Sequence, residues 1–332
     1  MKKFIDENAK QYKANLHSHS VHSDGHLTPE QLKEAYKKQG YSILAVTDHE
    51  HLLNHSDLND EDFILITAYE MYIRTLPFNY LSDSQAHINL YSKTPDNKML
   101  YYTPSITKYI PQEELKTLCY HKLVEERQYS VDFLKQTIED AKKCGYIVCH
   151  NHPTWSLEDQ SVASAYDGCF AMEIYNNDCY QLGYCEYNQH YYEYQLNRGL
   201  KMFPIASDDN HNPPNGVQDS FGGFTYILAK EFGYGGIISA LENGDFYAST
   251  GPRIYSLVAD NGELSVTTSP AERIMFITDN HHRKAFIAKE NESVNKASFN
   301  MNPTDKWLRI EVVDDKGRRA FSRAFTFDEI NG

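Results

Sequence analysis

The order of apolar and polar positions repeats along the first two thirds of the chain. In each repeat an amphipathic stretch ends at a glycine, a short apolar run follows, and that run leads into histidine or aspartate. The repeats occupy residues 28–49, 130–153 and 191–211. Apolar residues three or four positions apart predict helices, and the short apolar runs predict buried strands. Helices that alternate with buried strands predict a mostly parallel sheet.

The first repeat carries the clearest local signals. Thr28 can cap a helix, and Gln31 completes a capping box with it. The helix is expected to end at Gly40, because glycine accepts the left-handed conformation found after helix ends. The apolar run 42–47 then predicts a buried strand that leads directly to His49.

Ligand-type side chains recur where predicted strands end. Two further apolar runs contain or precede a carboxylate: residues 63–69 lead to Glu70, and residues 171–172 lead to Glu173. The strand of the third repeat contains Pro204, which fits only an edge or irregular position. Polar residues at the carboxyl ends of strands predict one site on that face of a barrel or an open sheet.

The pattern changes near Gly251. Beyond it, five strand-like runs are separated by turn signals, and no amphipathic helix is predicted. We expect a small all-β, sandwich-like module there. The expected domains are residues 1–250, which carry the polar strand ends, and residues 251–332.

Composition and charge narrow the range of functions. The 332 residues include 32 Lys and Arg against 46 Asp and Glu, for a net charge of −14. Such an acidic chain is a poor general binder of nucleic acid or anionic membrane, so a small-molecule partner is expected. We expect neither a membrane span nor a secretory signal. The six scattered cysteines suit reduced thiols in a cytoplasm, although Cys179 and Cys185 are close enough in sequence to bridge. The oligomeric state stays open.

Histidine is the unusual residue, with 15 copies. His17 and His19 would point in the same direction in an extended segment. Two of the candidates also have a purely structural interpretation. Asp24 can stabilise the turn in which it lies, and His87 can be a hydrogen-bonded core residue. A carboxylate at Glu70 would be costly unless it is paired or bound to metal. Taken together, nine such residues favour a multinuclear metal site, and nitrogen and oxygen donors suit zinc, manganese or iron. The nine are His17, His19, Asp24, His49, Glu70, His87, His152, Asp209 and His211.

These residues resemble the ordered motifs of the PHP (polymerase and histidinol phosphatase) superfamily. The resemblance covers residues 15–212 and is nearest to the stand-alone two-domain metallohydrolases of the CehA/McbA-like type. The phrase at residues 244–251 and the β-rich tail are similar to those proteins too. The resemblance implies a distorted (β/α)7 barrel in front of the β module, with two or three divalent ions.

The resemblance also implies roles for individual residues. Three ligand sets follow from it: His17, His19 and Asp209 with Glu70 as a bridge; His87 and His152, again with Glu70; and Asp24, His49 and His211. Many family members carry histidine where this chain has Asp24, so occupancy of the third set stays open. His150 is the alternative to His152, which we prefer because the family's histidine directly precedes a proline. Glu173 is expected to orient a ligand histidine, and Asp48 and Asp208 are expected either to support ligands in the same way or to serve a structural role.

The activity implied is hydrolysis of a small phosphorylated metabolite or nucleotide by a metal-activated hydroxide. Glu70, Asp24 and His211 are the expected catalytic residues, with a third ion or a protonated histidine assisting the leaving oxygen. The candidate substrate contacts are Arg74, Trp155, Arg198 and Arg253. An amide, ester or carbamate substrate is the alternative, since no arginine follows Trp155. A metal-binding accessory protein without activity is a further alternative.

Overall fold

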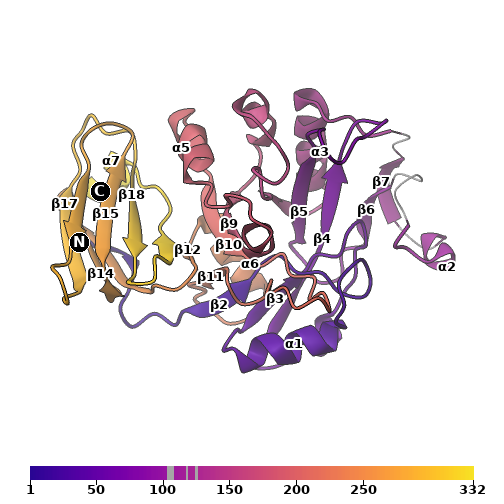
Figure 1. Ribbon diagram of the computed structural model, residues 1–332, viewed down its shortest axis with the longest axis horizontal. Coiled ribbons are helices and arrows are strands. Elements are labelled where there is room, and N and C mark those ends of the chain that lie inside the picture. The colour runs from indigo at the N-terminus through magenta and orange to yellow at the C-terminus, as the bar shows by residue number, and fades with distance from the viewer. Residues whose placement is uncertain (103–107, 117–118, 124–125) are drawn as a thin grey trace.

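The computed structural model describes residues 1–102, 108–116, 119–123 and 126–332, with only the backbone of residues 100–102 and 120–123. It is a mixed α/β structure with a β-rich part at one end (Figure 1). The helices are α1 (Pro29–Lys38), α2 (Gln112–Leu115), α3 (Val131–Lys143), α4 (Asn177–Gln181), α5 (Gln189–Asn197), α6 (Tyr234–Asn243) and α7 (Phe327–Asn331), with short 3-10 turns at Ser56–Leu58 and Gln160–Tyr166. The strands of the first part are β1 (Lys2–Ile5), β2 (Tyr12–Asn15), β3 (Ile43–Val46), β4 (Ile64–Ile73), β5 (Ala86–Ser92), β6 (Met99–Tyr102), β7 (Cys119–Leu123), β8 (Tyr146–His150), β9 (Ala171–Asn176), β10 (Phe203–Ser207), β11 (Phe224–Ile227) and β12 (Phe246–Ser249). The remaining strands are β13 (Ile254–Asp260), β14 (Glu263–Ala271), β15 (Arg273–Thr278), β16 (Lys284–Ile287), β17 (Val294–Asn300), β18 (Leu308–Val313) and β19 (Arg319–Phe321).

The local signals of the first repeat are confirmed. The Thr28 side chain accepts a hydrogen bond from the Gln31 amide, and the Gln31 side chain accepts one from the Thr28 amide. α1 buries Leu32 and Tyr36 and leaves its charged face in solvent. The cap therefore sets where the helix begins, and the apolar face sets which side packs on the sheet.

One sheet of thirteen strands runs through the molecule. Its order is β10-β9-β8-β5-β4-β3-β2-β11-β12-β19-β18-β15-β16. β2, β3 and β4 are parallel, as are β8, β9 and β10, while β5 lies antiparallel to both of its neighbours. Pro204 lies in β10, the last strand at one end of this order, as its missing amide donor requires.

The segments that follow β2 and β10 contact each other, although these two strands are not paired. β10 does not pair with β2 in the sheet order, so the expected distorted (β/α)7 barrel is not confirmed. The segments that follow these two strands do touch: Ser18 and Asn210 form a parallel bridge. The Asp209 amide also donates to the His17 carbonyl at 2.9 Å. These contacts bring two groups of predicted ligands together from opposite ends of the strand order.

The β-rich part contains two sheets over one hydrophobic cluster. A four-stranded sheet, β1-β13-β14-β17, faces strands β15, β18 and β19 of the large sheet. Leu257 and Leu264 of the first sheet share this cluster with Ile274 and Ile310 of the second. Two differences from expectation are the pairing of β1 with β13 and the short helix α7, which Thr326 caps.

Two further expectations concern membranes and thiols. Across the described ranges, none of the helices has the length and apolarity that a membrane crossing needs. Cys179 and Cys185 are both free thiols, the first buried and the second exposed.

Candidate metal centre

All nine predicted ligands lie around one centre, although they come from six separate segments of the chain. They are supplied by the segment after β2 (His17, His19, Asp24), the segment after β3 (His49), β4 (Glu70), β5 (His87), the segment after β8 (His152) and the segment after β10 (Asp209, His211). Most of these side chains are buried, and buried ionisable groups need partners or ions. The sheet therefore gathers at one edge the residue types that metal ions prefer.

Glu70 is the hub of the centre. Its Oε1 atom lies 2.9 Å from His87 Nδ1 and 3.3 Å from His152 Nε2. Its Oε2 atom lies 3.0 Å from His49 Nδ1 and 3.4 Å from His19 Nε2. One carboxylate thus faces histidines from four segments, which is the geometry that a bridging ligand requires.

Asp209 gathers the two histidines that follow β2. His17 Nε2 and His19 Nε2 each lie 3.0 Å from Asp209 Oδ1, and the two nitrogens lie 3.2 Å from each other. The Asp209 backbone has a positive φ of 55°, a conformation that is rare for residues other than glycine. This conformation turns its carboxylate toward the centre. His17, His19, Glu70 and Asp209 together offer four donor atoms within 4.8 Å of one another.

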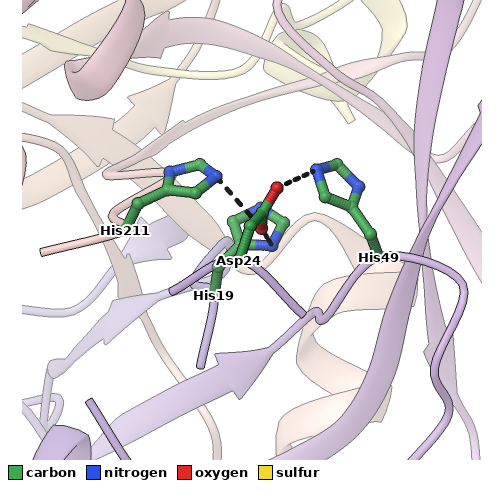
Figure 2. Close-up of side chains that lie close together, drawn as sticks. All are labelled: His19, Asp24, His49 and His211. Atoms are coloured by element: carbon green, nitrogen blue, oxygen red, sulfur yellow. Dashed lines mark ion pairs between the residues drawn. The ribbon is translucent and has the colours of Figure 1, made fainter. Parts of the chain in front are cut away.

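Asp24 lies between three histidines at the outer side of the centre. Figure 2 shows His19, His49 and His211 pointing toward its carboxylate. The closest nitrogens of these rings lie 3.5–3.6 Å from the Asp24 oxygens. Gly25 makes this turn possible, because a Cβ atom there would lie 2.3 Å from the His19 carbonyl oxygen. The carboxylate thus occupies the place that the third ligand set needs.

The donor atoms fit divalent ions. Bonds of about 2.0–2.2 Å place neighbouring ligand atoms roughly 3.0–3.5 Å apart, and the nitrogen-to-oxygen distances around Glu70 and Asp209 lie in that range. The buried Nδ1 atom of His49 has no hydrogen-bond partner in the structure, although it faces Glu70. A buried ring nitrogen that lies 3.0 Å from a carboxylate oxygen without a hydrogen bond is suited to sharing an ion with that carboxylate.

Electrostatics point the same way. Burial opposes charge on the His19 ring, but its hydrogen bonds to Asp209 and Glu70 outweigh burial and raise its pKa to about 10. Burial lowers the pKa of His87 and of His211 to about 4. The carboxylates therefore attract cations into this centre: protons on some rings when no ion is bound, and metal ions in exchange for those protons.

Neighbouring residues orient the ligands. Glu173 Oε1 accepts from His17 Nδ1 at 2.8 Å, which leaves Nε2 of that ring facing the centre. Glu173 Oε2 also accepts from the His152 amide at 2.9 Å. Two asparagines that the sequence patterns did not indicate also hydrogen-bond to the predicted ligands. Asn151 donates to Glu70, and Asn176 donates to Asp209.

Asp48 and Asp208 act on loops instead of on the ligand side chains. Asp48 accepts hydrogen bonds from Ser20 and Ser23, and so holds the loop that carries Asp24. Asp208 accepts from the amides of residues 221–223 and from the Tyr36 hydroxyl. Their role is to fix the backbone on which the ligands stand.

The structure distinguishes His152 from His150. His152 Nε2 faces Glu70, whereas His150 stacks on Tyr166 with ring centroids 3.5 Å apart. The Nε2 atom of His150 also pairs with Glu158 at 2.8 Å, away from the centre. Of these two histidines, only His152 is placed to bind an ion held by Glu70.

Replacing His152 with alanine should therefore reduce the metal bound per chain, and replacing His150 with alanine should not. Elemental analysis of both variants after reconstitution measures this directly. Equal metal loss in the two variants would contradict the assignment of His152.

Seven of the nine predicted ligands, all except His17 and His19, line a cavity of about 370 Å³. Of the predicted substrate contacts, Arg74 and Trp155 line it. The Trp155 ring lies 5.1 Å from His87 and 4.9 Å from His152, measured between centroids. The Arg74 guanidinium lies 4.8 Å from the Tyr72 ring centroid, and its buried Nε atom has no hydrogen-bond partner.

The other two predicted contacts do not line this cavity. Arg198 lies outside it, where it pairs with Asp167 at 2.9 Å at the end of α5. Arg253 also lies outside it, stacked over Tyr226 and hydrogen-bonded to Gln11. Each of these arginines has partners away from the cavity.

The cavity residues that the sequence patterns did not indicate include Lys108, Tyr109 and Asp178. Lys108 and Tyr109 enter the wall from the segment before α2, and Asp178 enters from α4. The Tyr109 hydroxyl donates to Asp24 Oδ2 at 3.2 Å. No metal-ligand spacing or strand end marks these positions, so the sequence offered no signal for them.

Comparison with known proteins adds structural neighbours only. No family model and no curated protein matches the chain. A solved two-domain protein from Bacteroides vulgatus, containing a predicted PHP-like metal-dependent phosphoesterase, is 18% identical; the match covers 97% of this chain and 96% of that one, with a TM-score of 0.48. The chain is similar to a PHP-like protein. An amidohydrolase from Chromobacterium violaceum, solved with sulfate and no metal, is 13% identical over 61% of this chain and 89% of that one, with a TM-score of 0.40.

Proposed function

We propose that this protein is a PHP-like, metal-dependent phosphoesterase that hydrolyses a small phosphorylated metabolite or nucleotide. The observation that carries the proposal is the convergence of nine nitrogen and oxygen ligands at one centre, seven of which line a cavity together with Arg74 and Lys108. We further propose a distorted (β/α)7 arrangement for the strands from β2 to β10, and residues 1–250 as the catalytic domain.

The residues present can hold two or three ions of zinc, manganese or iron. His17, His19, Glu70 and Asp209 would hold the first ion, and His19, Asp24, His49 and His211 offer donors for an outer one. His87 and His152 both face Glu70 Oε1, and would hold the ion between them. His49 also approaches Glu70 and His87, so it stands between two ligand sets. Bound divalent ions lower the pKa of water and neutralise charge on phosphoryl oxygens.

The protein's own side chains would bind and position the phosphate. Arg74 and Lys108 are cations on the cavity wall, and Arg74 can present its guanidinium because the Tyr72 ring supports it. Trp155 covers the side of the centre next to His87 and His152 and limits the access of water. The Tyr109 hydroxyl donates a hydrogen bond to Asp24, and so holds that carboxylate toward the three surrounding histidines.

Replacing Arg74 or Lys108 with alanine should raise KM for a phosphate ester about 10- to 100-fold, because each loses a hydrogen bond to a charged group. Arg198→Ala, outside the cavity, is the matched control and should leave KM unchanged. Steady-state kinetics on the metal-loaded enzyme provide the measurement. A KM that changes equally in all three variants would remove these two residues from substrate binding.

A carbonyl substrate is the second candidate, and one feature of the wall favours it. Asp178 lines the cavity, and a carboxylate there opposes an anionic phosphate. Burial raises the pKa of Asp178 to about 7, which lessens this repulsion below neutral pH. An uncharged amide, ester or carbamate would not be repelled by this carboxylate.

The deciding experiment joins elemental analysis with a substrate panel on one purified sample. The chain is stripped with a chelator, reconstituted with manganese, zinc or iron, and assayed on nucleotides, sugar phosphates, phosphodiesters, aryl esters and carbamates. Phosphate release that disappears on stripping and returns with metal supports the proposal. Metal-dependent cleavage of esters or carbamates alone supports the second candidate. Tight metal binding without turnover would indicate an accessory protein.

A further inference from the structure

The structure has a second cavity, of about 400 Å³. None of the predicted metal ligands lines it. One wall is the end of α5 and the turn into β10, and the other comes from the segments around β18 and α7. In Figure 1, α5 stands next to the β-rich part, and Trp307 Nε1 donates to Asn197 Oδ1 at 3.0 Å across this junction. The cavity is therefore built between the two parts of the fold.

The surface of this cavity is mainly apolar. Met202, Phe203, Trp307 and Phe325 line it and are buried in the protein. Polar groups near the wall already have partners, since Asn197 accepts from Trp307 and Thr326 caps α7. A ligand in this space would therefore meet hydrocarbon on most sides.

The charge of the lining is opposite to that of the whole chain. Three cations, Lys201, Lys306 and Arg323, face the cavity together with one carboxylate, Glu329. Glu329 forms an ion pair with Arg323, with 3.0 Å between their charged groups. Within the described ranges neither Lys201 nor Lys306 forms an ion pair, although the chain carries a net charge of −14. Lys201 Nζ lies 5.7 Å from the Phe203 ring centroid, and its charge helps to lower the pKa of Glu329. Two exposed ammonium groups beside an apolar space are the complement of an amphipathic anion.

We propose that this cavity binds a small amphipathic anion, with an apolar body against Trp307 and Phe203 and a carboxylate or phosphate between Lys201 and Lys306. Its volume suits such a ligand, because a cavity of about 150 Å³ already accommodates benzene. None of the predicted metal ligands lines this cavity. β10 connects the two regions, because its first residue, Phe203, lines the cavity and its end leads to Asp209.

Octanoate and its uncharged amide, octanamide, test the proposal on the full chain. The chain has two tryptophans, so Trp155→Phe leaves Trp307 as the single fluorescent reporter. Octanoate should change Trp307 emission saturably and should bind about 10-fold more tightly than octanamide, as a charge-assisted contact predicts. The Lys201→Ala/Lys306→Ala variant should bind both probes equally. Lys296→Ala, an exposed lysine on β17, is the matched control and should keep the preference.

Several results would overturn this assignment. They are equal affinity for the two probes in the parent chain, a preference that survives in the double lysine variant, and emission that does not saturate. Vesicles of phosphatidylcholine with phosphatidylglycerol distinguish a lipid surface from a free ligand. Sedimentation with these vesicles, together with no response to octanoate, would also contradict a free amphipathic ligand. Circular dichroism checks that each variant is folded.

Discussion

Glu70→Gln is expected to abolish hydrolysis and to lower the metal content of the purified chain. The Glu70 carboxylate faces His19, His49, His87 and His152, so losing its charge weakens every ligand set at once. The change should lower kcat/KM by at least about 10³-fold, because several kcal/mol of metal-dependent transition-state stabilisation correspond to such a factor. Elemental analysis and steady-state kinetics on the same preparation measure the two effects together.

Glu158→Gln is the matched control for this prediction. Glu158 is also buried and also pairs with a histidine, His150, but it lies outside the metal centre. That variant should keep its bound metal and most of its activity. If Glu70→Gln retained full metal content and turnover, the ligand assignment itself would be wrong, whatever the substrate.

Arg127→Met should destabilise the folded protein by about 3–5 kcal/mol, the cost of leaving a buried carboxylate without its counter-ion. Arg127 and Glu50 are both buried, and two guanidinium nitrogens lie 2.6 and 2.8 Å from the two Glu50 oxygens. Arg127 also donates to the Tyr72 carbonyl, and so ties the segment before α3 to β4. Urea unfolding followed by circular dichroism gives the free energy of unfolding.

An exposed ion pair provides the contrast. Lys116 and Glu113 pair at 2.8 Å with both side chains in solvent, so Lys116→Met should change stability by less than about 1 kcal/mol. The double variant Glu50→Gln/Arg127→Met should recover part of the loss, because no charge remains buried alone. A loss under 1 kcal/mol in Arg127→Met would mean that the pair contributes little to folding.

Local elements were predictable because their causes are local. The capping box at Thr28 and the apolar face of α1 act within one helix, and Ser130 caps α3 in the same way. The ligands lie close to strand ends because a parallel arrangement brings those ends to one edge. Residue types alone indicated the chemistry, since buried histidines and carboxylates in this number need ions or counter-charges.

Other features depend on contacts between residues distant in sequence. No sequence pattern distinguishes Arg74 from Arg198, because each is a single arginine close to apolar residues. Only packing shows that one lines the metal cavity and the other pairs with Asp167. In the same way, the antiparallel direction of β5 and the pairing of β1 with β13 follow from the partners that each strand finds.

The sequence by itself determined the helix caps, most buried strands, the ligand types and their order along the chain. The tertiary structure decided that His152 and not His150 faces Glu70, and that Lys108 and Asp178 share the cavity with the ligands. It also decided that Lys201 and Lys306 face one apolar space. The physical reason is range: caps and periodicity act over a few residues, whereas the side-chain environment depends on segments that meet only in the folded chain.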